Sequence, residues 1–478
     1  MTGQSVRKRN DDCNWQWLPM TASLALMWFS CLTSAWSQDL ATDQSASFGL
    51  GTSVGIEKVA EDLFLTPRLT LVGSIPTPSI YCDGSDACET QTRFGLSPAL
   101  RFRIRDDPPT DTGILRKEDY SRPEHFVGIL SFLEYGHRSE VLHGRLGRLG
   151  SVEVGHGTLV AGYHNVVSVD RHQLGAEGAL HTAYGGAQLF VDHLLEPEVL
   201  GGRSYVRPWA FFDKDSWFHR LAVGMSVVTD IAAPLRLRND RGATSSAIFL
   251  EPVAAETDAT VFVGLDLEIA AVETETIRFT GYSDGNLHLG QGAGWHLGGL
   301  TKLQLRPDLS LSGRLEYRLF GAGYLPDYFG PLYEIDRSQT MGWGVSLPAP
   351  KLRVAASQPD KSRHGAYGRL TIHLKDWFQA STAYADAQGA KNSWLSGRLS
   401  FQAPGGIHLA GLYFHQFFDS LVDLAQAEST LILVQSHVPI WGPLFAEGRY
   451  DRQWQLSEDG LYEPVVSWNL GVGVSFTL

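Results

Sequence analysis

The residues with the most evident chemical potential are Asp111 and His156, which stand in two short glycine-containing motifs, 111-DTGI-114 and 156-HGTLVAG-162. An aspartate that orients a histidine, and a histidine that takes a proton from a serine, form the triad of nucleophilic hydrolysis. That chemistry also needs a serine after the histidine, and 242-GATSSA-247 lacks the spacing of a nucleophile motif. The sequence therefore offers two members of a triad without the third.

Both motifs resemble those of subtilisin-type serine proteases, H-G-T-x-V-A-G for the histidine and D-[ST]-G-[IV] for the aspartate. The resemblance implies a secreted protease in which Asp111 orients His156. Asp111, however, follows a polar turn with two prolines, 105-RDDPPT-110, where the family has the end of a buried strand. The Gly51-Thr52-Ser53 triplet precedes both motifs, and the strand–helix alternation of that fold is missing. We interpret the resemblance of the two motifs to those of subtilisin-type proteases as a chance match.

Histidines are concentrated in one region of the chain, where carboxylates are also frequent. Eight of the sixteen histidines fall there: His125, His137, His143, His156, His164, His172, His181 and His193. A metal site, a proton-sensitive gate or a binding patch would use such residues. None of their spacings forms a recognised ligand set, so polar positions that tolerate histidine are the better explanation. We expect no metal and no cofactor.

Charged side chains also alternate with apolar ones in several segments, and these are the candidate pore-lining residues. They are Arg93, Arg101, Arg103, Arg105, Arg314, Glu316, Arg318, Glu447, Arg449 and Asp451. In a water-filled lumen, rows of opposed charge would set a transverse field and filter solutes. The alternative is that the charges pair across strands and only stabilise the wall, by roughly 0.2–1 kcal/mol each.

The elements that must position these residues are strands, because apolar residues recur with a period of two. In 465-VVSWNLGVGVSFTL-478 every even position is apolar, and 309-LSLSGRLEYRLF-320 and 261-VFVGLDLEIAA-271 repeat the pattern. The segments are about ten residues long, one face of each is aliphatic and aromatic, and the other face of many is charged. Lipid demands such an exterior and a wide barrel holds a wet lumen. We predict an all-β protein, an antiparallel transmembrane β-barrel of about 16–18 strands.

The last strand resembles the C-terminal signal of Gram-negative outer-membrane barrels, in which alternate apolar residues run to a terminal aromatic. Leu470, Val472, Val474 and Phe476 keep the alternation, although the chain ends in Leu478. The resemblance implies location in the outer membrane, contact with its lipid, and recognition by the barrel-assembly machinery.

The N-terminus, 1–37, has the basic, apolar and small-residue regions of a signal peptide, which leaves 38–478 for the barrel. No apolar run of 18 residues follows it.

Within 134–210 the alternation weakens, which allows a plug or long loops there as well as strands with bulges. Cys82 and Cys88 bracket a short turn, and we expect a disulfide between them. The formal net charge of −13 argues against nucleic acid as a partner.

These patterns favour a porin-like passive channel for small polar or anionic solutes, with no enzymatic activity and with the possibility of a homo-oligomer. Two alternatives stay open: a structural or assembly barrel with a plugged lumen, and a barrel with a hydrolase site at its rim. For the hydrolase, the only candidates are the Asp170/His172 and Asp192/His193 pairs. The secreted protease is the least favoured interpretation.

Overall fold

A computed structural model describes most of the chain from residue 46 onward. The described ranges are 46–80, 89–106, 113–116, 119–120, 126, 128–138, 140–168, 173–212, 217–237, 252–345, 347–375, 377–403, 405–425, 430–457 and 461–477. The signal peptide, the Cys82–Cys88 pair, Asp111, His125, Asp170 and His172 lie outside them.

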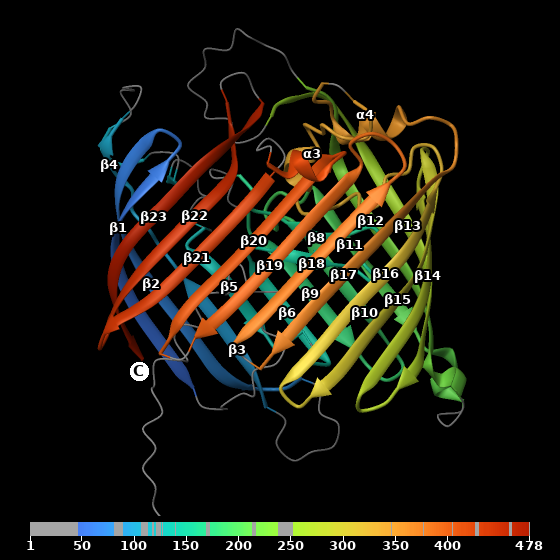
Figure 1. Ribbon diagram of the computed structural model, residues 1–478, viewed down its shortest axis with the longest axis horizontal. Coiled ribbons are helices and arrows are strands. Elements are labelled where there is room, and N and C mark those ends of the chain that lie inside the picture. The colour runs from blue at the N-terminus through green and yellow to red at the C-terminus, as the bar shows by residue number, and fades with distance from the viewer. Residues whose placement is uncertain are drawn as a thin grey trace, which may run out of the picture.

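Antiparallel strands close on themselves to form a barrel (Figure 1). Closure comes from the first strand, which pairs with both the second and the last, so that Gly49 lies opposite Thr477. Within the described residues the wall has 20 strands. They are β1 (Ser47–Val59), β2 (Asp62–Pro78), β3 (Glu89–Leu96), β5 (Leu130–Tyr135), β6 (Leu142–Gly147), β9 (Gly175–His181), β10 (Gly185–Val191), β11 (Val199–Val206), β12 (Leu221–Leu237), β13 (Ala254–Glu273), β14 (Ile277–His288), β15 (Gly292–Arg306), β16 (Leu309–Phe320), β17 (Arg363–Leu374), β18 (Phe378–Ala387), β19 (Ser393–Ala403), β20 (Ile407–Phe418), β21 (Thr430–Trp441), β22 (Leu444–Leu456) and β23 (Tyr462–Thr477).

The predicted antiparallel β-barrel is confirmed, and only its strand number needs correction from 16–18 to 20. The difference arises between residues 130 and 206, where β5, β6, β9, β10 and β11 are short and follow one another closely. A further short strand, β4 (Phe102–Arg105), pairs with β2 beside β3. The expected number of strands was too low because the alternation is weak in this region.

The wall has a charged inner face and an apolar outer face. In β16, Arg314 and Arg318 are each 2 % exposed, whereas Leu315 between them is 76 % exposed. The inner face is identified by Arg314, which forms an ion pair with Glu153 of a segment inside the barrel. Exposed apolar side chains such as Leu265 and Leu470 continue the outer face around the wall. Lipid requires an apolar exterior because hydrocarbon does not solvate polar side chains, and closure of the barrel pairs the backbone polar groups of the wall strands.

The two ends of the barrel differ in the length of their connections. The end at which β1 begins and β23 ends has mostly short turns and is called the termini end below. At the opposite, loop end, long connections join β3 to β5, β6 to β9, and β16 to β17. Short turns typically face the periplasm and long loops the exterior. No helix of the described residues is long and apolar enough to span a membrane.

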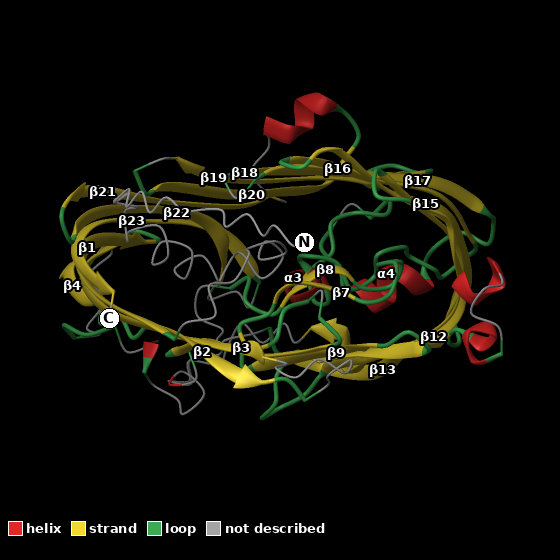
Figure 2. Cartoon of the chain, turned by 90° about the horizontal axis from the view of Figure 1, so that it is seen from below, coloured by secondary structure: helices red, strands yellow, loops and turns green. Residues whose placement is uncertain are grey.

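Two connections from the loop end fold into the lumen. One contains the hairpin of β7 (Gly150–Glu153) and β8 (Ala161–His164), and the other contains α3 (Tyr333–Asp336) and α4 (Lys351–Ala356). Their buried core includes Val160, Tyr163 and Phe329, which pack against the wall. Figure 2 shows these elements in one half of the oval lumen. Among the described residues, short helical turns also occur at η3 (Pro208–Phe211), η4 (Trp217–Arg220) and η5 (Leu421–Ala425).

The motif at His156 forms the turn of the lumenal hairpin. Gly155, Gly157 and Gly162 have φ angles of 59°, 69° and 69°, which L-residues with side chains rarely adopt. A Cβ on Gly157 would also lie 2.8 Å from the Glu153 carboxylate. The segment 134–210, for which a plug, long loops or bulged strands were open, therefore supplies both wall strands and this inserted hairpin.

Candidate functional site

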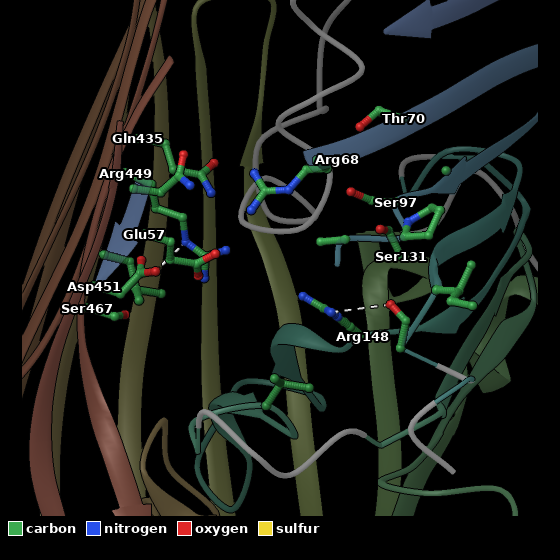
Figure 3. Close-up of a pocket in the computed structure, with 18 of the residues that line it drawn as sticks. Glu57, Arg68, Thr70, Ser97, Ser131, Arg148, Gln435, Arg449, Asp451 and Ser467 are labelled. Carbon is green, nitrogen blue, oxygen red and sulfur yellow. Dashed lines mark hydrogen bonds and ion pairs between the residues drawn. The ribbon is translucent and has the colours of Figure 1, made fainter. Parts of the chain in front are cut away.

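The half of the lumen beside the inserted segments contains a chamber of about 250 Å³ (Figure 3). We call it the mixed-charge chamber, because cations and carboxylates line it in equal number. Its charged residues are Glu57, Arg68, Arg101, Asp119, Arg148, Glu447, Arg449 and Asp451. Figure 3 shows Glu57, Arg449 and Asp451 along one wall, with Arg148 on the opposite side.

Most charges of the mixed-charge chamber are compensated by a neighbour. Arg101 contacts both Glu57, at 2.9 Å, and Asp119, at 2.8 Å. Arg68 lies 3.7 Å from Glu447, and Arg449 forms an ion pair with Asp451. The chamber therefore presents alternating potential to a solute rather than a field of one sign.

The structure distributes the predicted pore-lining residues over several places. Arg101, Glu447, Arg449 and Asp451 come together in the mixed-charge chamber. Arg93 pairs with Glu134 at 3.1 Å, and Arg103 pairs with Asp62 at 3.2 Å. Arg105 is exposed at the end of β4, and Arg314, Glu316 and Arg318 face the half that holds the inserted segments.

Glu57, Arg68, Asp119 and Arg148 line the same chamber but were not predicted from the sequence. Glu57 and Arg68 carried a usable signal: each stands on the small or polar face of an alternating strand, opposite Ile56 and Leu69. Asp119 and Arg148 lie in connections, where no periodicity applies. Only the folded connections bring them to the chamber.

In the other half, Arg314, Glu316 and Arg318 form a buried network with inserted residues. Glu316 accepts hydrogen bonds from Arg314 and Arg318, each at 2.5 Å. Arg318 also binds Asp327 of the inserted segment, at 2.6 Å. These charges attach the β16–β17 connection to the wall. Removing one partner would leave a buried charge uncompensated.

His156 is held between two carboxylates of the wall. Its Nδ1 lies 2.9 Å from Asp284 and its Nε2 lies 3.0 Å from Glu268, while the ring stacks on Tyr282 at 4.1 Å. Burial lowers the pKa of His156, but the hydrogen bonds to Asp284 and Glu268 outweigh burial and raise the pKa to about 9. Both ring nitrogens of the cationic form donate to a carboxylate. The ring is therefore an ionic clamp without a nitrogen available as a base.

His156 also belongs to the one group of possible metal ligands that was found among the described residues. The group consists of His156, Asp266 and Asp284. It does not fit a cation. Asp266 accepts two hydrogen bonds from Arg203, at 2.9 and 2.6 Å, and His156 is itself positively charged there. Positive charge already occupies the ligand atoms that a metal would need.

No protein-family model matches the sequence, and no curated protein matches it. Solved structures to which the chain is similar include the following three, all at low identity and low TM-score. Acinetobacter baumannii OccAB2 is 9 % identical, covers 92 % of this chain and 100 % of its own, and has a TM-score of 0.33. Pseudomonas aeruginosa OccK11 (OpdR) is 13 % identical, with coverages of 91 % and 96 % and a TM-score of 0.32. The outer membrane protein OprD from Pseudomonas aeruginosa is 10 % identical, with coverages of 91 % and 94 % and a TM-score of 0.28.

The closed antiparallel wall with its apolar outer face places the chain in an outer membrane. The expected contact with membrane lipid follows from that face.

Proposed function

We propose that the protein is a porin-like passive channel and that solutes cross it through the mixed-charge chamber. The single observation that carries the proposal is the position of this chamber, in the half of a closed barrel beside the inserted hairpin and helices. Eight charged side chains line it together with apolar ones, and charged groups inside a closed barrel are typical of a water-filled lumen.

The charges of the chamber favour small polar solutes over a pathway for anions alone. Arg68, Arg101 and Arg449 each have a carboxylate nearby, so the arginines do not act as an isolated anion filter. Such paired charges orient a solute dipole as it passes. The role we propose for Arg101 is to offset the negative charges of Glu57 and Asp119.

The alternatives have less support in the geometry. A rim hydrolase needs a base within reach of a nucleophile. Of its two candidate pairs, Asp170/His172 lies outside the described residues. In the other pair, Nδ1 of His193 accepts a hydrogen bond from the Leu174 amide, and Asp192 accepts hydrogen bonds from backbone amides. A structural barrel with a plugged lumen is supported by the inserted segments, and it differs from the channel in conducting no ions.

Ion conductance in planar lipid bilayers tests the channel. The wild-type protein should conduct, and R101S should shift the reversal potential in a salt gradient towards cation preference, because Glu57 and Asp119 lose their partner. The matched control is R105S, because Arg105 is exposed at the end of β4 and does not line the chamber. Absence of conductance would favour the plugged structural barrel, and equal reversal potentials for R101S and R105S would refute the role of the chamber.

A further inference from the structure

A second chamber, of about 400 Å³, lies in the half of the barrel that holds the hairpin. We call it the basic chamber. Its charged residues are Arg138, Glu153, Arg278, Lys302, Arg314, Arg369 and Arg398. Arg278 follows the start of β14 and Lys302 lies near the end of β15, so both stand close to the turns of the termini end. Figure 2 looks into the barrel from that end.

The lumenal hairpin lines the chamber on the inner side. Ser151 and Glu153 of β7 are the hairpin residues that contact it. A smaller cavity of about 90 Å³ shares Ser151, Glu153, Arg369 and Arg398 with it and runs on to Trp394. Trp394 in turn packs against the buried clusters that contain Phe414 and Tyr367. The basic chamber is therefore a vestibule near the turns of the termini end that continues into the smaller cavity.

Among the described residues, cations exceed carboxylates around this vestibule even when the ion-pair partners outside the lining are counted. Glu153 bridges Arg369, at 2.9 Å, and Arg314, at 3.3 Å. Burial raises the pKa of Glu153, but Arg369 and Arg314 outweigh it and bring the pKa to about 2, so the carboxylate is ionised. Outside the lining, Glu177 pairs with Arg138, Glu273 with Arg278, and Glu316 with Arg314. Six cations thus face four carboxylates.

The excess positive charge resides on Arg398 and Lys302. In the described part of the chain, neither forms an ion pair; Arg398 instead donates to the Ser151 hydroxyl at 2.5 Å. Hydroxyl and amide side chains fill the remaining polar wall: Thr280, Thr301, Ser312, Thr371, Gln379 and Ser381. Guanidinium, ammonium and hydroxyl groups together are the donors that recognise tetrahedral oxyanions.

We propose that the basic chamber is a binding site for a divalent oxyanion of the phosphate or sulfate type. The excess of two positive charges matches one such anion, and it comes from Arg398 and Lys302, which form no ion pair with a carboxylate of the described residues. The site takes its ligand from the termini end and lies apart from the mixed-charge chamber. It does not depend on solute passage through that chamber.

Isothermal titration of the folded barrel in a neutral detergent at low salt tests the site, with inorganic sulfate, inorganic phosphate and glycerol phosphate as separate probes. Sulfate should bind with a stoichiometry of one, and R398Q and K302Q should each weaken binding by about ten-fold, as expected for the loss of one charge-assisted contact. E153Q should tighten binding, because it removes the one lining carboxylate. The matched control is R306Q: Arg306 is an exposed arginine at the same end of the barrel that does not line the chamber.

Heat-modifiable migration in detergent verifies that each variant is folded before titration. Binding of sulfate and phosphate but not of glycerol phosphate identifies a free ion, and binding of all three identifies the phosphate group of a larger molecule. Equal affinity for acetate and sulfate would overturn the proposal, as would an unchanged affinity in R398Q and K302Q. Conductance of the same preparations separates the two proposals: binding without conductance contradicts only the channel, and conductance without binding contradicts only this site.

Discussion

The ionic clamp on His156 predicts that alkaline pH loosens the hairpin inside the lumen. The pKa of His156 is about 9 in the folded protein against 6.5 for an ordinary histidine, and its side chain is only 4 % exposed. One pKa unit corresponds to about 1.4 kcal/mol, so the clamp stabilises the inserted hairpin by about 3 kcal/mol. Because the folded pKa is raised, this stabilisation is complete below pH 6.5. It is lost as the pH rises through 9.

Hydrogen exchange of the hairpin amides measures this change directly. The amide of Gly157 donates to the Val154 carbonyl and that of Ala161 donates to the Phe329 carbonyl, at 3.0 and 3.2 Å. After correction for the intrinsic exchange rate, their protection should fall by about 100-fold between pH 6 and pH 9.5, if the hairpin opens locally. H156Q should show low protection at both values and no pH dependence in this window.

His164 of the same hairpin provides the control. Burial and Arg398 lower the pKa of His164 to about 3, so this ring is neutral throughout the window and H164Q should keep the alkaline loss of protection. Equal protection of the wild-type amides at pH 6 and pH 9.5 would refute the clamp. A pH dependence that persists in H156Q would show that another group controls the hairpin.

Two further predictions concern the inserted segment between β16 and β17 and the wall of the barrel. G294A should destabilise the inserted segment by about 1–3 kcal/mol, because its Cβ would lie 2.3 Å from the Tyr324 ring, whereas the matched G281A meets no atom within 4 Å. Hydrogen exchange of residues 324–337 measures the effect, and equal exchange in the two variants would contradict it. L315R should destabilise the barrel in lipid by about 2–4 kcal/mol, because Leu315 is 76 % exposed at the middle of β16, and L309R at the start of that strand should cost about 0–1 kcal/mol. Urea titration of the lipid-inserted barrels measures both, and similar unfolding midpoints would place the lipid contact elsewhere.

The sequence by itself determined the architecture, because the alternation that lipid imposes is local. In β16, Leu315 and Tyr317 face outward while Arg314, Glu316 and Arg318 face inward, and this period of two is legible without any partner strand. The same rule failed for the strand number, because β5 to β11 are short and their glycine-rich alternation is weak. Their place in the wall comes from pairing with neighbours.

Only the tertiary structure determined which inward-facing residues line each half of the lumen. The inward rows of β16 and β22 look alike in sequence, yet Arg314 meets the inserted hairpin and Arg449 lines the mixed-charge chamber. The difference depends on which connections fold inward and where they pack. A periodic pattern says which face a residue occupies, but not what stands opposite it.

His156 shows the same limit at the level of one residue. Its local motif resembled a protease histidine, and the missing serine and missing fold were enough to reject that function. Its actual partners, Asp284 and Glu268, are separated from it by 128 and 112 positions in the chain. They belong to strands of the wall, and only the insertion of the hairpin into the closed barrel brings their carboxylates to the ring. The sequence was enough to exclude a protease role for His156, and the fold determined that its partners are Asp284 and Glu268.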